Sequence, residues 1–261
     1  MYGFKVDFDE EERKALREAL LDMREFVEAQ VFISDECDWC EATISMLNTI
    51  SEESERDGKK LFSFKIFRKG VDNDIIRKLN ITRYPTIYFL EGSIRYYGIP
   101  AGEEIRALVE TIIRLSQGDS GLENTTIKRI KEFNASAVIE TIVTPSCPYC
   151  PYAVLLANMV AYESYRSGKR NIVSVVVEAY ENMDIAEKYA VTSVPTIVIN
   201  GRVEFIGVPY EDQLLDSIYR IAYRRAAARA PIAAGGSTED RELKRLIEEV
   251  VKEIEGKEEK K

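Results

Sequence analysis

The chain has 261 residues, 45% of them hydrophobic and 31% charged, which suits one large globular domain or two of ordinary size. A net charge of −9 without a basic block argues against nucleic acid as a partner. The chain contains no histidine, which excludes Ser-His-Asp and Cys-His catalysis, histidine-ligated zinc and histidine pH switches.

The N-terminal residues are acidic where a secretion signal would be basic and then apolar. No stretch reaches the roughly 18 consecutive apolar residues that a membrane span needs. We therefore expect a soluble cytoplasmic protein without membrane association. In a reducing cytosol, paired cysteines indicate redox or metal chemistry rather than structural disulfides.

The first half of the chain predicts alternating helices and strands. A helix is expected over residues 9–29, where Asp9 can cap the start. Its apolar positions follow helical spacing: Leu16, Leu20, Met23 and Val27. The next predicted elements are a strand at 31–33, a helix from Cys40 to about 56, a strand at 62–67, a helix at 72–79, strands at 86–90 and 94–97, and a helix at 103–116.

The second half predicts the same elements in the same order, αβαβαββα. These are a helix at 123–134, a strand at 138–143, a helix from Cys150 to about 166, a strand at 172–178, a helix at 183–189, strands at 196–199 and 203–206, and a helix that begins near 210. The turn-rich segment 117–121 is the expected join between the halves.

A long internal repeat links the halves. Pro85 follows Cys37 by 48 positions, and Pro195 follows Cys147 by the same 48. A self-match of this length signals a duplicated unit. We predict an α/β protein with two tandem units, residues 1–118 and 122–228, each with a central mixed four-stranded sheet flanked by helices.

A third segment, residues 237–256, predicts a separate amphipathic helix. Its apolar stripe consists of Leu243, Leu246, Ile247, Val250, Val251 and Ile254. The helix could pack on the surface of its own chain or join two chains, so a monomer and a dimer both stay open.

All four cysteines fall in two Cys-x-x-Cys pairs, each between a predicted strand and a predicted helix. The unpaired N–H groups and the dipole at a helix N-terminus favour a thiolate there. We therefore predict that Cys37 and Cys147 are the exposed nucleophiles, and that Cys40 and Cys150 are the buried thiols that resolve the mixed disulfides.

Cys147-Pro148-Tyr149-Cys150 resembles the active site of glutaredoxins, and the Pro-Thr step 48 residues later resembles the thioredoxin fold. Over about residues 10–225 the chain resembles the glutaredoxin-like protein disulfide oxidoreductases of thermophilic prokaryotes. The resemblance implies exchange with protein thiols and disulfides, by oxidation, reduction and isomerisation. It also implies a thioredoxin-reductase-like flavoprotein as electron donor. We expect no metal and no cofactor beyond the disulfides Cys37–Cys40 and Cys147–Cys150.

By this resemblance the two repeated prolines are cis and face the sulfurs. A cis proline leaves the backbone of the preceding residue free to pair with an extended substrate. The aromatic residues between the cysteines either offer apolar surface to substrate chains or cover the helix ends. The expected substrate-binding residues are therefore Tyr84, Pro85, Val194, Pro195, Trp39 and Tyr149.

Thioredoxins carry a buried carboxylate six residues before the first cysteine, and it accepts a proton from the resolving thiol. Val31 and Thr141 occupy those positions here, and neither can accept that proton. Glu178, at the end of a predicted strand, is the substitute candidate in the second unit, although a glutamate at a strand end more commonly reaches solvent.

The two predicted sites differ in charge. Four carboxylates surround the first pair and none surrounds the second; they are Asp35, Glu36, Asp38 and Glu41. Negative charge raises the free energy of a nearby thiolate, so Cys37 should be less acidic than Cys147 and the first site the more reducing. We expect Arg83 to offset part of this charge.

Two other functions stay open. Four thiolates could bind metal, but zinc ribbons separate their pairs by about 15–20 residues, whereas 106 residues lie between Cys40 and Cys147. A glutaredoxin-type iron–sulfur cluster carrier, with its cluster shared between two chains, is the remaining metal alternative. The second alternative is a binding module that holds unfolded chains without redox chemistry.

Overall fold

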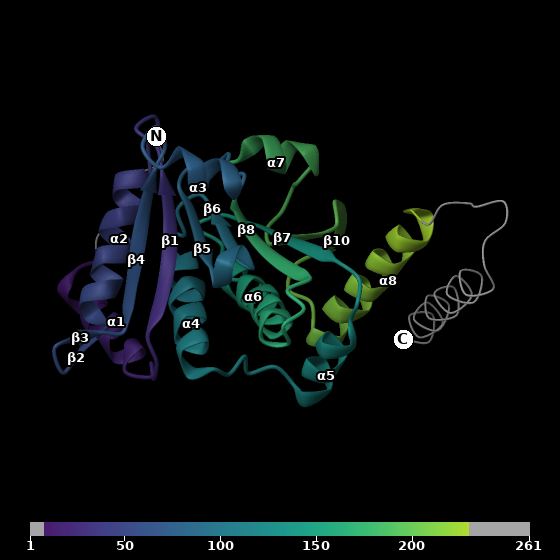
Figure 1. Ribbon diagram of the computed structural model, residues 1–261, viewed down its shortest axis with the longest axis horizontal. Helices are drawn as coiled ribbons and strands as arrows, with labels where there is room; N and C mark the ends of the chain where they lie inside the picture. The colour runs from purple at the N-terminus through teal and green to yellow at the C-terminus, as the bar shows by residue number, and fades with distance from the viewer. Residues whose placement is uncertain (1–7, 230–261) are drawn as a thin grey trace.

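The structure is a computed structural model that describes residues 8–229, so the predicted helix 237–256 lies outside the described residues. The first half contains α1 (Glu10–Leu20), β1 (Val27–Ile33), α2 (Cys40–Glu53), β2 (Glu55–Arg56), β3 (Lys59–Lys60), β4 (Phe62–Arg68), α3 (Asn73–Lys78), β5 (Thr86–Phe89), the 3-10 turn η1 (Leu90–Gly92), β6 (Ile94–Tyr97) and α4 (Glu104–Gln117). Figure 1 shows the second half beside it. It contains α5 (Asn124–Glu132), β7 (Ala137–Val143), α6 (Cys150–Arg166), β8 (Ile172–Glu178), α7 (Met183–Lys188), β9 (Thr196–Ile199), β10 (Arg202–Ile206) and α8 (Glu211–Arg229). The predicted order αβαβαββα is confirmed in the second half, and the first half has the same order with β2, β3 and η1 added. No helix in 8–229 is long and apolar enough to span a membrane.

The first predicted helix was too long. α1 ends at Leu20, and Val27, which fits the helical spacing, lies in β1 instead. The guanidinium of Arg56 donates hydrogen bonds to the carbonyls of Leu20 (3.0 Å), Leu21 (2.9 Å) and Met23 (3.3 Å). These bonds satisfy carbonyl groups that a longer helix would have used internally.

The sequence analysis missed a small hairpin after α2. The predicted helix to residue 56 ends at Glu53, and β2 pairs with β3 in antiparallel register. Asp57 and Gly58 form the turn with φ of 51° and 74°. An Asp-Gly pair is the usual signal for such a two-residue turn, so the signal was present in the sequence.

The sheet is continuous across the two halves, in the order β10-β9-β7-β8-β6-β5-β1-β4. Each half contributes its four predicted strands, and each set is mixed, since β1 is parallel to β4 but antiparallel to β5. The join is a parallel pairing of β6 with β8, from Ile94 beside Ser174 to Tyr97 beside Val177. This join was not predicted.

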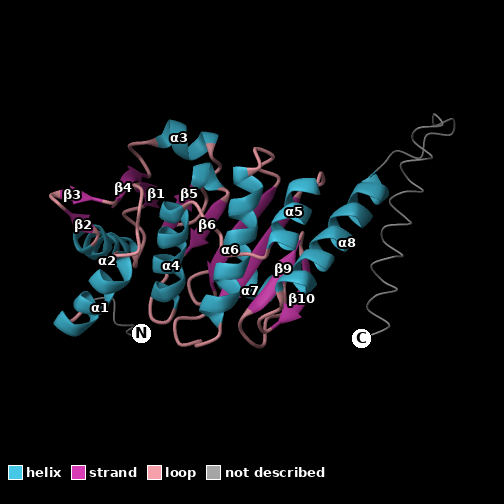
Figure 2. Ribbon diagram, turned by 90° about the horizontal axis from the view of Figure 1, so that it is seen from below, coloured by secondary structure: helices cyan, strands magenta, loops and turns pink. Residues whose placement is uncertain are grey.

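Helices cover both faces of the sheet, and one hydrophobic core spans the join. In β1, Phe32 packs with Ile76 of α3, whereas Val31 lies in the main core on the opposite face. That main core also contains Leu108 of α4 and Val154 of α6. α4 and α6 lie side by side in both views (Figures 1 and 2). The two units are therefore packed into one body.

A buried polar network lies at the same join. The side-chain amide of Asn158 on α6 donates to the hydroxyls of Tyr96 (2.9 Å) and Thr111 (3.1 Å). Its carbonyl oxygen accepts a hydrogen bond from the hydroxyl of Ser174 at 2.7 Å. The network connects α6 to α4, β6 and β8, and all four side chains are buried.

Candidate functional site

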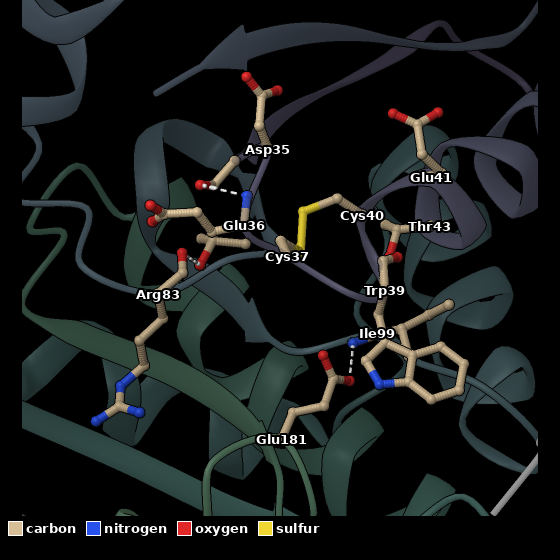
Figure 3. The surroundings of a disulfide bond; sticks show 12 residues. Asp35, Glu36, Cys37, Trp39, Cys40, Glu41, Thr43, Arg83, Ile99 and Glu181 are labelled. Carbon is tan, nitrogen blue, oxygen red and sulfur yellow. Dashed lines mark hydrogen bonds between the residues drawn. A yellow bond between two sulfur atoms is a disulfide. The ribbon is translucent and has the colours of Figure 1, made fainter. Parts of the chain in front are cut away.

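Each Cys-x-x-Cys pair lies where the sequence predicted it, between a strand and a helix. α2 begins at Cys40 and α6 begins at Cys150, so the helix N-termini point at the sulfur atoms. Cys37 and Cys40 form one disulfide, and Cys147 and Cys150 form the other; in both, the Cα atoms lie 5.5 Å apart. Figure 3 shows the first of these disulfides.

Exposure separates the two cysteines of each pair. Cys40 is 2% exposed and Cys150 is 0% exposed, as expected for resolving thiols. Cys37 is half-buried, but Cys147 is only 7% exposed, so the expectation of an exposed nucleophile is wrong for the second site. The loop before Cys147 is covered from the first half, where the Glu103 N–H donates to the carbonyl of Pro145 at 2.9 Å.

Hydrogen bonding also distinguishes the sulfur atoms. The backbone N–H of Cys150 donates to Sγ of Cys147 at 3.1 Å. Within the described residues no such bond reaches Sγ of Cys37, where the Cys40 N–H faces only the Cys37 carbonyl, at 3.5 Å. A sulfur that accepts an amide hydrogen bond is stabilised as a thiolate, which favours the predicted acidity order.

The cis state that the family resemblance implies for the two prolines is confirmed, and their placement against the sulfurs stays a prediction. The bonds Tyr84–Pro85 and Val194–Pro195 are both cis. Both prolines are buried, and the two preceding residues are half-buried. Tyr84 also lines the cavity described next, so it lies at the first site as predicted.

A cavity of about 320 Å³ lies beside Cys37, and both halves of the chain form its walls. The first half contributes Glu36, Cys37, Asp38, Trp39, Tyr84 and Ile99, and the second contributes Pro145, Glu178, Tyr180 and Glu181. The two aromatic residues between the cysteines differ in exposure. Trp39 is half-buried in the wall of this cavity, whereas Tyr149 is 66% exposed.

The β8–α7 connection holds the second half against the first site. The side-chain amide of Asn182 donates to the carbonyl of Tyr97 at 3.1 Å. Arg83 donates to the side chains of Asn182 (3.0 Å) and Asp184 (2.5 Å). Figure 3 shows the Arg83 guanidinium turned away from the disulfide, so the prediction that Arg83 offsets the charge near Cys37 is wrong.

Gly98 permits this close approach. A Cβ atom at Gly98 would lie 2.8 Å from Cβ of Glu178 and 2.8 Å from Oε1 of Glu181, closer than real side chains come. Its φ of 91° is also unfavourable for other residues. The backbone N–H of Ile99, the next residue, donates to Oε1 of Glu181 at 2.7 Å (Figure 3).

The side chain of Glu178 is buried and does not reach solvent. Its neighbours come from both halves of the chain. It is 4% exposed and lies in the wall of the cavity beside Cys37, at the first site. β8 joins β6, so the end of β8 is carried to the neighbouring unit's site. Burial raises the pKa of the Glu178 carboxyl, which suits a group that exchanges protons. Its role as proton acceptor stays a prediction.

Basic residues at the end of β4 neutralise part of the charge around Cys37. Arg68 pairs with Asp35 and lies 4.0 Å from a carboxylate oxygen of Glu41. Lys69 pairs with Glu36 at 2.9 Å. The sequence analysis missed these partners, because they come from a strand about 30 positions further along the chain. These ion pairs oppose the predicted difference between the sites, which stays a prediction.

A second buried carboxyl, Glu104, was also missed. It is 1% exposed at the start of α4, and neither of its carboxylate oxygens has a hydrogen-bond partner within residues 8–229. Burial, with a smaller contribution from Glu103, raises the pKa of Glu104 to about 8. The sequence signal was its position on the apolar face of the helix, four residues before Leu108.

Comparison with known proteins identifies the family. Residues 138–218 match the thioredoxin domain family. A thioredoxin of Methanocaldococcus jannaschii is 40% identical over 80 residues, which are 31% of this chain and 89% of that protein. An alkyl hydroperoxide reductase component of Pseudomonas aeruginosa is 30% identical over 110 residues, which are 42% of this chain and 20% of that protein.

Solved structures extend the similarity to both units. A protein disulfide oxidoreductase from Aeropyrum pernix is 49% identical, with a TM-score of 0.81, over 84% of this chain and 95% of that one. A domain of the alkylhydroperoxide reductase AhpF from Enterococcus faecalis, 18% identical over 81% of this chain and all of that one, has the same fold with a TM-score of 0.70. This chain therefore belongs to the thioredoxin family, and it is a dithiol–disulfide oxidoreductase with two redox-active Cys-x-x-Cys sites.

Proposed function

We propose that the chain exchanges disulfides with protein substrates in the cytoplasm, and that it takes electrons from a thioredoxin-reductase-like flavoprotein. The supporting observation is the pair of disulfides at helix N-termini, each with a fully buried second cysteine. We propose that these two disulfides are the only redox groups, so no separate cofactor is required. Among the described residues, no three side chains of the types that bind metals converge on one point.

The exchange takes two steps at each site. In the reduced enzyme, the Cys147 thiolate attacks one sulfur of a substrate disulfide, forms a mixed disulfide and releases one substrate thiolate. The Cys150 thiolate then attacks Sγ of Cys147, which forms the enzyme disulfide and releases the second substrate thiolate. Two electrons pass to the substrate, and the protons of the two enzyme thiols pass to the substrate thiolates or to solvent.

Reduction of a disulfide-bonded protein tests this proposal. The reduced chain is mixed with insulin, and new insulin thiols are counted. We expect one insulin disulfide to be reduced for each Cys-x-x-Cys pair. The control is the Cys37→Ser/Cys147→Ser variant, which should bind unfolded chains as before but reduce nothing. Equal reduction by the control would overturn the proposal, and a brown protein with iron absorbance would favour a cluster carrier.

A further inference from the structure

The cavity beside Cys37 is acidic and aromatic. Four of its ten lining residues are carboxylates, three are aromatic, and none is basic. The carboxylates are Glu36, Asp38, Glu178 and Glu181. A water molecule takes up roughly 30 Å³ in the liquid. A cavity of about 320 Å³ therefore has room for a chain of several non-hydrogen atoms, as in one long side chain.

The two carboxylates from the second half have no cationic partner in residues 8–229. Glu181 accepts the Ile99 N–H, and Oε2 of Glu178 accepts the Glu181 N–H at 2.7 Å. Oε1 of Glu178 is buried and has no hydrogen-bond partner among the described residues. Burial of an unpaired carboxylate is costly, so this wall of the cavity favours binding of a positive charge or of a proton.

The basic side chains around the cavity are already paired. Lys69 binds Glu36 at the rim, and its Nζ lies 6.0 Å from the centre of the Tyr84 ring. Arg83 binds Asp184. Neither forms an ion pair with the carboxylates that the second half contributes, so within residues 8–229 no basic side chain fills this role and the cavity can accept a cation from a substrate.

We propose that this cavity binds the lysine or arginine side chain of a substrate protein, next to the cysteine that Cys37 attacks. The cavity opens beside the nucleophile, so a side chain adjacent to the substrate cysteine can enter it. Glu178 and Glu181 supply acceptors for charge-assisted hydrogen bonds, and the Trp39 and Tyr84 rings supply cation–π surface. The inference rests on the disulfide exchange proposed above.

The second site provides an internal contrast. The residues around Cys147 are uncharged, from Pro145 to Pro151. A preference for basic substrates should therefore belong to the first site alone. Because Glu178 and Glu181 come from the second half, the first unit by itself would lack this preference.

The preference should depend on pH. Burial raises the pKa of Glu181 to about 7; the hydrogen bond from the Ile99 N–H opposes this rise, and repulsion from Glu178 makes a smaller contribution to it. The other titratable groups that face the cavity are Glu178, the Cys37 thiol of the reduced enzyme, Glu36 with its partner Lys69 at the rim, Asp38, Tyr84 and Tyr180. Below pH 7 Glu181 takes up a proton, so the attraction for a cation should weaken as the pH falls from 8 to 6.

Peptide kinetics test the inference. The enzyme is the reduced full chain with Cys147→Ser and Cys150→Ser, so that only the first site reacts. Each peptide carries one cysteine as a mixed disulfide with thionitrobenzoate, and arginine or uncharged norleucine stands next to it. The Cys37 thiolate attacks the peptide sulfur, the old S–S bond breaks, and coloured thionitrobenzoate leaves. Its release gives the rate constant.

We expect the arginine peptide to react on the order of ten times faster than the norleucine peptide, the effect of one charge-assisted hydrogen bond. Glu178→Gln/Glu181→Gln should lower this ratio to that of the second site, measured in a Cys37→Ser/Cys40→Ser chain. Glu181→Gln alone should lower the arginine-to-norleucine rate ratio in part. This single variant keeps the test possible if the double variant does not fold. Glu187→Gln, an exposed change of the same charge, should leave it unchanged.

Three results would overturn the inference. The first is an equal ratio at both sites, which indicates general attraction by the net charge of −9. The second is an unchanged ratio after Glu178→Gln/Glu181→Gln. The third is an arginine-to-norleucine rate ratio near one, combined with a shift in the pH dependence of the Cys37 reaction in Glu181→Gln. This combination would show that the cavity binds a proton and not a cationic side chain. Loss of exchange with both peptides would instead overturn the proposed function.

Discussion

The two halves carry opposite charges at the same point of the same fold. Arg68 ends β4, and Glu178 ends β8, the equivalent strand 110 positions later. β4 is the outer strand of the sheet, and Arg68 pairs with Asp35 beside the site of its own unit. β8 lies between β7 and β6, and Glu178 reaches the site of the other unit. A duplicated fold therefore produces two different sites when only one outer strand of each unit joins the other unit.

The helices that carry the cysteines show the same contrast. Asn48 on α2 and Asn158 on α6 are equivalent in the repeat, again 110 positions apart. Asn48 is exposed, whereas Asn158 is fully buried in the polar network at the join. Equivalent asparagines therefore have different surroundings, because α6 lies at the join between the halves and α2 does not.

The largest expected effect concerns the cysteines of the second site. Cys150→Ser should trap substrate proteins as mixed disulfides on Cys147, because the thiol that would release them is gone. Cys147→Ser should trap none through Cys150, which is 0% exposed. Mass spectrometry of the adducts decides, and the same pair of variants at Cys37 and Cys40 shows whether the sites share this order. Adducts on Cys150 would contradict the assignment.

The next effect concerns the pH dependence of stability. The folded pKa of Glu104 is about 8, against a usual value of 4.5, so the unfolded chain loses this proton first. The contribution of this one carboxyl to stability is therefore greatest below pH 4.5 and falls as the pH rises towards 8, by up to about 5 kcal/mol. Glu104→Gln should remove this loss, so it should raise the unfolding free energy at pH 8 and leave it nearly unchanged at pH 4.

Urea unfolding at both pH values measures the effect of Glu104→Gln. The control is Glu211→Gln at the start of α8, the equivalent helix, where the side chain is only half-buried. An equal gain from both variants at pH 8 would show that burial of Glu104 is not the cause.

A smaller effect is expected at the polar network. Asn158→Ala leaves the hydroxyls of Tyr96, Thr111 and Ser174 without their partner inside the core. We expect a loss of about 2–4 kcal/mol in the free energy of unfolding. Asn48→Ala, the equivalent surface change, should alter it by less than about 0.5 kcal/mol. Similar losses from both variants, measured by denaturant unfolding, would mean that the join adds nothing.

The smallest effect is the difference between the two redox sites. The hydrogen bond to Sγ of Cys147 and the carboxylates near Cys37 both predict a lower thiol pKa for Cys147. Stabilising a thiolate stabilises the dithiol form, so the first site should be the more reducing, by up to about 30 mV for one pKa unit. Arg68→Gln removes a cation beside Asp35 and should widen the gap.

Alkylation rates against pH measure the two thiols separately. One variant lacks Cys147 and Cys150, and the other lacks Cys37 and Cys40. If Cys37 ionises at or below the pH of Cys147, the charges and the hydrogen bond do not control the difference. If Arg68→Gln leaves Cys37 unchanged, the pairing with Asp35 has no influence on the sulfur.

The sequence by itself determined the repeat, the order of the main elements, the two cysteine pairs and the positions of the two repeated prolines, whereas the cis state of those prolines was implied by the family resemblance. These features depend on spacing within one half, such as the 48 positions from Cys37 to Pro85, and the repeat shows each of them twice. Local patterns were less reliable where a distant group intervenes. The carbonyls at the end of α1 are satisfied by Arg56, which no pattern within residues 9–29 reveals.

Only the tertiary structure decided what surrounds each site. The apolar run of β8 from Ile172 to Val177, interrupted only by Ser174, is typical of a strand buried on both faces, but it does not specify the neighbouring strand. The pairing of β6 with β8 placed Glu178 beside Cys37, and the segment after β8 gave Arg83 a different partner. Contacts between the halves depend on matching edges and charges across the whole chain, and no spacing within either half encodes that match.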